Sequence, residues 1–386
     1  MKIYIRTQGT RVVREGRHLL VKKGGDTYHT LFVEKLEQVV LFGNIEITPP
    51  ARNILLRHGV DTVFCTQNGR YLGRFAIPES KNVMLRKQQF TLLDNHSFGL
   101  ELCRQIVTGK LMNMATLLMR IQRTKNRPEP KTAARQIRDL FKAVAAAESI
   151  DSVRGYEGRG SALYFSAFRW GLQQDHGFCR RVRRPPTDPV NAVLSLLYTF
   201  LFNRVYAAIR QVNLDPYPAF LHVPDYGRHS LVMDLMEEFR VIVVDTLTLS
   251  LFNLKILQAD DFVHESPPPA KAPSPDRATS DITTDPYGHM ADLNSAGQFD
   301  LPNQRMNEEA ITDLVTEDGH GKPAVKLHEA AFRRVVENFE RKLATEFYYG
   351  PLERSVTYGD ALVHQAAMYR KIIEGTVRVY QPLLLK

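Results

Sequence analysis

The chain has 386 residues, enough for two domains with a sizeable core. Its content of 44% hydrophobic and 24% charged residues is typical of a soluble globular protein. The formal net charge of +9 favours an anionic partner such as nucleic acid over a membrane surface, although a basic protein without such a partner would carry the same charge.

The cysteines and the N-terminal residues say little about function, but they bear on the cellular compartment. Cys65, Cys103 and Cys179 are widely separated and form neither a zinc-binding pattern nor a disulfide framework, which suits a reducing compartment. The first residues lack the apolar run of a signal peptide, and the apolar stretch at 193–202 is too short to span a bilayer. We therefore expect a cytoplasmic protein.

Residues 1–75 are predicted to form a small β-rich domain. Short β-rich runs, such as 39–42, alternate with turns that contain glycine or asparagine. One helix interrupts the strands, because Thr48 can cap it, Pro49 suits its first turn and Gly59 can end it.

Residues 76–82 are predicted to link this domain to a larger all-α catalytic domain at 83–386, so the expected fold class is α+β. Asp188 followed by Pro189 marks the start of a strongly apolar helix. Further helices are predicted where apolar residues recur every three or four positions. These stretches are 83–94, 99–108, 112–123, 131–147, 327–347 and 360–373.

A different composition begins near residue 263 and ends near 325. This stretch is rich in proline, alanine, serine, aspartate and threonine, with few large apolar side chains. It cannot bury enough surface to offset the entropy lost on ordering, which predicts a flexible insertion.

Two stripes are predicted on the helix around residues 230–240. Apolar residues with helical spacing form the buried stripe: Val232, Leu235, Met236 and Phe239. Carboxylates form the second stripe: Asp234, Glu237 and Glu238. Their mutual repulsion would be relieved by a cation or by nearby arginines. The alternative is a solvated acidic face beside Arg240.

His222 and Glu157 are the other candidate ligands. A neutral imidazole such as that of His222 can bind a transition metal or Mn²⁺, and a turn at 226–228 could fold it back over Asp234 and Glu237. Glu157 lies between glycines just before an apolar helical stretch at 162–170, where a ligand could approach closely. A packed histidine and an ordinary residue near a helix start are the alternatives.

Arginines are dense around these motifs, notably at 180–184 and at positions 154, 159 and 169, on either side of Glu157. Guanidinium groups pair well with phosphate oxygens and would position a nucleic-acid backbone without reading its sequence. A cation held among arginines suggests chemistry on a phosphodiester. The alternative is a solvated charged surface.

Together these motifs resemble the CRISPR-associated adaptation integrase, the Cas1 family, over nearly the whole chain. The most specific segments are Gly-Tyr-Glu-Gly at 155–158, Phe-Leu-His at 220–222 and the acidic helix at 230–240, joined by 184–192 and 82–86. The chain departs from the family in its proline-rich stretch at 263–325, which lies outside the metal motifs.

The resemblance implies that Glu157, His222 and Glu237 are catalytic and bind Mg²⁺ or Mn²⁺, with Asp234 as a support or alternate ligand. It also implies a homodimer formed through the β-domain, a small Cas2 partner, and double-stranded DNA as the substrate, inserted as short segments into a CRISPR array by attack of a 3′-hydroxyl. We expect six arginines to contact the DNA: Arg86, Arg159, Arg181, Arg184, Arg228 and Arg240.

Two other functions stay open. A catalytically silent nucleic-acid-binding scaffold would keep the basic surface and use the acidic cluster structurally. A metal-dependent RNA nuclease would use the same ligands on a different substrate.

Overall fold

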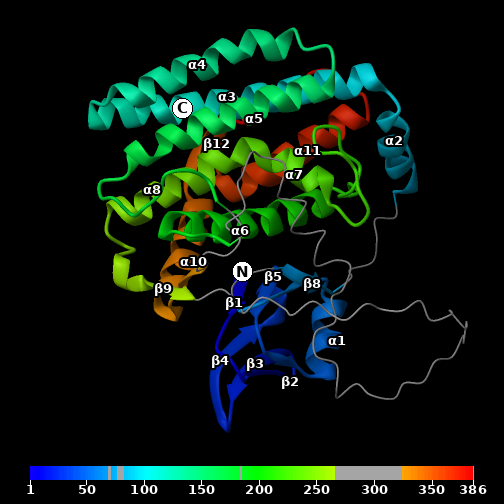
Figure 1. Cartoon of the computed structure of the whole chain (residues 1–386). Coiled ribbons are helices and arrows are strands. Elements are labelled where there is room, and N and C mark those ends of the chain that lie inside the picture. Colours follow the sequence, from blue (N-terminus) through cyan, green and yellow to red (C-terminus); the bar gives the residue numbers. More distant parts are fainter. Residues whose placement is uncertain (68–70, 76–81, 183–184, 266–323, 386) are drawn as a thin grey trace, which may run out of the picture.

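The computed structural model describes residues 1–67, 71–75, 82–182, 185–265 and 324–385 (Figure 1). The predicted turn at 68–69, residues 76–81 of the predicted linker, Arg184 and residues 266–323 of the predicted insertion lie outside the described residues.

The N-terminal region contains two four-stranded sheets and one helix. In the first sheet three parallel strands are followed by an antiparallel one: β1 (Lys2–Ile5), β5 (Gln38–Phe42), β7 (Asp61–Cys65) and β8 (Tyr71–Arg74). The second sheet has the order β4 (Asp26–Phe32), β3 (His18–Lys23), β2 (Arg11–Glu15) and β6 (Glu46–Ile47). This region has its own apolar core, to which β2, β3, β5 and α1 contribute.

The helix α1 (Pro49–Arg57) connects the parallel strands β5 and β7, a connection that parallel pairing requires. Pro49 occupies its first position and Gly59 follows its end with a φ of +63°, as the sequence predicts. Thr48 precedes the helix, but its hydroxyl donates to the Val12 carbonyl at 3.2 Å instead of accepting from the helix.

The larger region is mostly helical, which confirms the predicted fold class. Its helices are α2 (Val83–Leu93), α3 (His96–Lys125), α4 (Pro128–Ala145), α5 (Ile150–Phe168), α6 (Pro189–Gln211), α7 (Ser230–Phe239), α8 (Thr246–Asn253), α10 (Glu329–Ala344) and α11 (Tyr358–Ile373).

This region also contains two short antiparallel strand pairs that the sequence did not indicate, so it is not wholly α. They are β9 (Phe262–Glu265) with β10 (Ala324–Leu327), and β11 (Glu346–Tyr349) with β12 (Arg354–Thr357). The first pair takes up both ends of the predicted insertion, where Val325 is buried. Those end residues are therefore strand, contrary to the prediction of a flexible stretch from 263 to 325.

The helices form layers (Figure 1). α3, α4 and α5 lie side by side on the side away from the sheets, and α6, α7 and α11 lie between them and the β-rich region. α6 is long and apolar enough to cross a membrane, but 78% of its most apolar 18-residue stretch is buried in the protein. It is the central core helix, and it extends well beyond the apolar stretch noted in the sequence.

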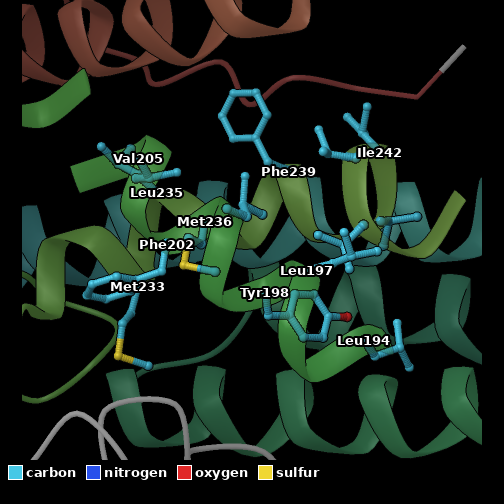
Figure 2. Packing of buried hydrophobic residues seen from close by; sticks show 14 of the residues in the cluster. Leu194, Leu197, Tyr198, Phe202, Val205, Met233, Leu235, Met236, Phe239 and Ile242 are labelled. Carbon is cyan, nitrogen blue, oxygen red and sulfur yellow. The ribbon is translucent and has the colours of Figure 1, made fainter. Parts of the chain in front are cut away.

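The packing of α6 against α7 forms the middle of the core (Figure 2). α6 and α7 are in contact, and Val205 and Phe202 of α6 lie beside Leu235 and Met236 of α7. All the labelled side chains belong to one buried cluster: Leu194, Leu197, Tyr198, Phe202 and Val205 of α6, and Met233, Leu235, Met236 and Phe239 of α7. This contact includes the apolar stripe of α7, as its spacing predicts. α7 is thereby fixed in the interior with no face left for solvent.

α3 is a single 30-residue helix where the sequence predicted two helices. Gly109 falls within the predicted break, yet it is helical because it meets the C-terminal tail closely. A Cβ added there would lie 2.4 Å from ring atoms of Pro382. The glycine therefore reflects a packing contact and not a helix end.

α7 runs into α8 through a π-helix, η3 (Arg240–Asp245). π-Helical turns hold an extra residue and are frequent at functional sites. The segment is buried throughout, with Arg240 at its start beside Glu237 and Asp245 at its end. The Asp245 carboxylate accepts from the hydroxyls of Tyr164 and Tyr198 at 2.8 and 2.6 Å.

The β-rich and helical regions are joined by buried polar contacts of α6. Arg204 donates to Gln38 Oε1 and Tyr4 Oη, both at 2.8 Å, and pairs with Glu340 of α10. Arg74 of β8 donates to Asn203 Oδ1 at 2.9 Å. Because these groups are buried and paired, they fix the two regions relative to each other.

Candidate metal centre

All ten residues of α7 are buried, which excludes the solvated acidic face that the sequence left open. The three carboxylates also do not share one environment. Asp234 faces the loop that contains His222, Glu237 faces α3 and α5, and Glu238 faces the C-terminal tail. Successive residues on a helix are about 100° apart, so Glu238 turns away from its neighbour.

Asp234 shapes the histidine loop. One of its oxygens accepts from the backbone N–H of Phe220 and of Leu221 at 3.0 Å. The other accepts from the His222 backbone N–H at 2.9 Å and lies 2.7 Å from His222 Nδ1. With Nδ1 donating to the carboxylate, Nε2 is left with its lone pair. That nitrogen lies 3.8 Å from Glu237 Oε1.

Glu157 lies in the middle of α5, so its predicted position just before a helix is wrong. Close packing of α5 on α3 explains a third glycine, Gly160. A Cβ added there would lie 2.2 Å from Leu111 Cδ2. The close approach brings Glu157 to Lys110 of α3, and Ser161, one turn later, donates to Glu157 Oε1 at 2.8 Å.

Lys110 links the two glutamates. Its ammonium forms an ion pair with Glu157 Oε1 and another, at 2.5 Å, with Glu237 Oε2. On the other side, Arg240 Nε donates to Glu237 Oε1 at 3.0 Å. Burial opposes ionisation of Glu237, but Arg240, Lys110 and His222 outweigh it and lower the pKa of Glu237 to about 2.

Glu238 holds the C-terminal tail. It accepts from Tyr380 Oη at 2.6 Å, from Gln365 Nε2 at 2.7 Å and from the Leu383 backbone N–H at 2.5 Å. Burial raises the pKa of Glu238 to about 7, although these hydrogen bonds oppose the shift. It therefore has a structural role and stands apart from the other two carboxylates of the predicted stripe.

The donor atoms of Glu157, His222 and Glu237 suit a divalent cation. Carboxylate oxygens are hard ligands, and a histidine fixed by a carboxylate through its other nitrogen is the usual arrangement of a metal ligand. Within the part of the chain that the structure describes, no three acidic, histidine or cysteine side chains form a ready cage. The Lys110 ammonium lies between the two glutamates.

The predicted DNA-binding arginines fall into two groups. Arg181 and Arg240 lie in the interior, at 4% and 3% exposure. Arg181 donates to Asn191 Oδ1 at 2.8 Å, and burial lowers its pKa to about 10. These positions favour a structural role over a direct DNA contact.

The other described members of that set are nearer the surface or in surface loops. Arg159 is exposed on α5, two residues after Glu157, and Arg86 is half-buried with Asp215 at 3.1 Å. Arg228 lies in the turn between His222 and α7, and 9% of its surface is exposed. Their contacts with DNA remain predictions.

Lys110 is the residue that the sequence analysis missed. A signal for it exists, because it occupies the apolar stripe of α3 that contains Cys103, Val107 and Met114. A lysine at such a core position requires a buried partner. That partner cannot be named from the sequence, since it lies on two other helices.

Buried glutamates and a histidine in a protein of net charge +9 are the residue types expected of a metal-dependent nuclease. The model of the family described as CRISPR associated protein Cas1 matches residues 3–268, and the chain belongs to that family. It is a CRISPR-associated endonuclease, which confirms the family and the enzyme class that the sequence predicted, and such enzymes require a divalent metal.

Two similar proteins are named as endonucleases of the same family. "CRISPR-associated endonuclease Cas1 2" of Rhodospirillum rubrum is 34% identical over 271 residues, 67% of this chain and 78% of that protein. "CRISPR-associated endonuclease Cas1 3" of Thermus thermophilus is 34% identical over 249 residues, 64% of this chain and 70% of that protein.

Three solved structures share the fold. The Cas1 protein of Thermotoga maritima superposes with a TM-score of 0.72 and 19% identity, over 98% of this chain and 99% of that one. A casposase bound to its integration product gives 0.76 and 17%, over 100% and 95%. A chain of a Cas6-RT-Cas1–Cas2 complex gives 0.76 and 22%, over 100% of this chain and 36% of that longer chain.

Proposed function

We propose that this endonuclease cuts and joins DNA, inserting short segments into a CRISPR array by attack of a DNA 3′-hydroxyl on a phosphodiester. The observation that carries the proposal is that one buried cluster brings together Glu157, His222 and Glu237 from three separate segments. Lys110 pairs with both glutamates, and His222 Nε2 lies 3.8 Å from Glu237 Oε1. Membership of the Cas1 family and the resemblance to a casposase bound to its integration product support it.

Glu157, His222 and Glu237 would hold the metal, Mg²⁺ or Mn²⁺. Asp234 would be a support and not a ligand, because both its oxygens already accept hydrogen bonds from the histidine loop. Its role would be to fix the tautomer of His222 so that Nε2 faces Glu237.

When bound, a divalent cation supplies polarisation of the scissile phosphodiester and stabilises the charge that develops on it. The protein holds its three ligands on rigid elements, two of them in mid-helix, which sets the position of the reacting group. Arg159 on the exposed face of α5 would position the DNA backbone. Attack by a 3′-hydroxyl joins strands, whereas attack by water leaves a nick.

The proposed partners are double-stranded DNA, a second copy of the chain bound through its β-rich region, and Cas2, which is named in the complexes that share this fold. The proposed compartment is the cytoplasm.

Strand transfer tests the proposal. Labelled duplex DNA with a free 3′-hydroxyl is mixed with a supercoiled plasmid and Mn²⁺, with and without Cas2. Glu157→Gln, His222→Asn and Glu237→Gln should each abolish joining and nicking while DNA binding persists. Glu238→Gln is the matched control, because it changes a buried glutamate of the same helix that faces away from the site.

Other results of the strand-transfer assay would change the ligand set or the function. Wild-type activity in one of the three variants removes that residue from the ligand set. Cleavage of RNA but not of DNA would favour the RNA nuclease. DNA binding without nicking or joining, even with Cas2 present, would favour the scaffold.

A further inference from the structure

Lys110 is a fully buried lysine in the middle of α3, with 0% of its side chain exposed. Removing an ammonium from water costs several kcal/mol unless anions and hydrogen bonds compensate. A methionine or leucine would pack in the same apolar stripe without that cost. The charge of Lys110 must therefore stabilise the groups that it contacts.

Those groups are the two carboxylates of the proposed ligand set. Nζ pairs with Glu157 Oε1 and lies 2.5 Å from Glu237 Oε2. A divalent cation bound by both glutamates would lie about 2.0–2.2 Å from carboxylate oxygens. The ammonium and the metal would therefore require the same space and the same oxygens.

We propose that Lys110 is an internal counter-cation that holds the metal-free site together and is displaced from Glu157 and Glu237 when the metal binds. This inference rests on the proposed ligand set. Lysine suits such a role, because its charge sits at the end of a flexible four-carbon stem that can swing away without moving the helix.

The charges of the site explain why a counter-cation is needed. The site contains three carboxylates, those of Glu157, Asp234 and Glu237. It contains two fixed cations, the Lys110 ammonium and the Arg240 guanidinium, and both contact the glutamates. Without Lys110 the excess of negative charge in the metal-free site would double. The glutamates of α5 and α7 would then repel each other in a buried setting, where screening is weak.

Arg240 cannot replace Lys110 in this role. It pairs with Glu237 Oε1 at 3.0 Å, on the other oxygen of the carboxylate, and its guanidinium lies 5.0 Å from the Tyr198 ring centroid. It neutralises Glu237 while leaving free the side that faces Glu157. A metal could bind there with Arg240 in place, but not with the ammonium in place.

The test is Mn²⁺ affinity of the full-length protein without DNA, measured from the electron paramagnetic resonance signal of free Mn²⁺. Lys110→Met should bind Mn²⁺ more tightly than the wild type, on the order of tenfold or more, because the competing charge is gone. Lys342→Met removes a lysine that lies over the Tyr358 ring, away from the site, and should leave the affinity unchanged.

Thermal unfolding gives a second readout. In EDTA Lys110→Met should melt below the wild type, and saturating Mn²⁺ should raise its melting temperature by more than it raises that of the wild type. Lys110→Gln, neutral but polar, should behave in the same way. If both variants unfold in EDTA, Mn²⁺ should restore the folded state; variants that stay unfolded in saturating Mn²⁺ would overturn the proposal.

Equal or weaker Mn²⁺ binding by the Lys110 variants would also overturn it, and so would a gain of the same size in Lys342→Met. The ligand set is tested separately by Glu157→Gln and Glu237→Gln, which should lose Mn²⁺ binding. If the wild type binds no Mn²⁺, or these two variants bind as it does, the ligand set fails. If they lose binding while the Lys110 variants bind as the wild type does, only the counter-cation fails.

Discussion

Replacing Asp234 by asparagine should separate the support of His222 from metal binding itself. The carboxylate accepts four hydrogen bonds, two at each oxygen, and is 1% exposed. An asparagine keeps one acceptor oxygen and turns the other into a donor. In the favourable orientation the NH₂ group takes the place of Oδ1. The His222 imidazole can then move its proton to Nε2 and accept at Nδ1, so only the backbone N–H of His222 faces the NH₂ group.

The magnitude follows from that one donor. A buried donor without an acceptor costs about 1–3 kcal/mol, so Asp234→Asn should lower the free energy of unfolding by about 2 kcal/mol. Glu238→Gln is the matched control, on the same helix and equally buried. It should cost about 1 kcal/mol or less, because the Tyr380 hydroxyl can reverse and accept from the new amide.

Urea unfolding of the three metal-free proteins at neutral pH measures both values. Asp234→Asn should also weaken Mn²⁺ binding by about 10–100-fold, since supporting groups of metal ligands have effects of that size, and Glu238→Gln should not. A loss of stability in Asp234→Asn no greater than in Glu238→Gln would refute the assignment of Asp234 as the organiser of the loop.

Two further predictions concern the buried framework. Burial raises the pKa of Asp245 to about 6 from 3.8, so the folded state holds the proton more tightly than the unfolded state. As the pH falls from about 7 to about 4, the wild type should therefore gain about 2 kcal/mol of stability relative to Asp245→Asn in urea unfolding. A difference independent of pH would contradict this. Gly109→Ala places a methyl 2.4 Å from the Pro382 ring, so it should lower the free energy of unfolding by about 1–3 kcal/mol. It should also speed proteolysis of the tail after Ile373. An unchanged digestion rate would show that the tail adjusts to the methyl group.

The sequence predicts those parts of the site that depend on local spacing. The positions of Asp234 and Glu237 on one helix, three residues apart, follow from the helical period, and the fixed imidazole of His222 lies where the predicted turn brings it. The apolar stripe of α7 is equally local, and its burial against α6 confirms the prediction.

What the sequence could not supply depends on contacts between distant segments. Glycine usually weakens a helix, so Glu157 between glycines suggested a helix start. The residues are helical, and Gly160 of the same helix is required by the close approach of Leu111 on α3. Lys110 and Glu238 find their partners on other helices and in the tail. No spacing within one segment encodes such partners.

The π-helix after α7 makes this part of the chain unusually sensitive to changes of length. Deleting one residue between Arg240 and Asp245 would restore the α-helical period and turn every later residue of the helix by about 100°. The Asp245 carboxylate would lose its hydrogen bonds from Tyr164 and Tyr198, and the core face of α8 would rotate toward solvent. Among homologous chains we therefore expect substitutions within this segment to be far more common than insertions or deletions.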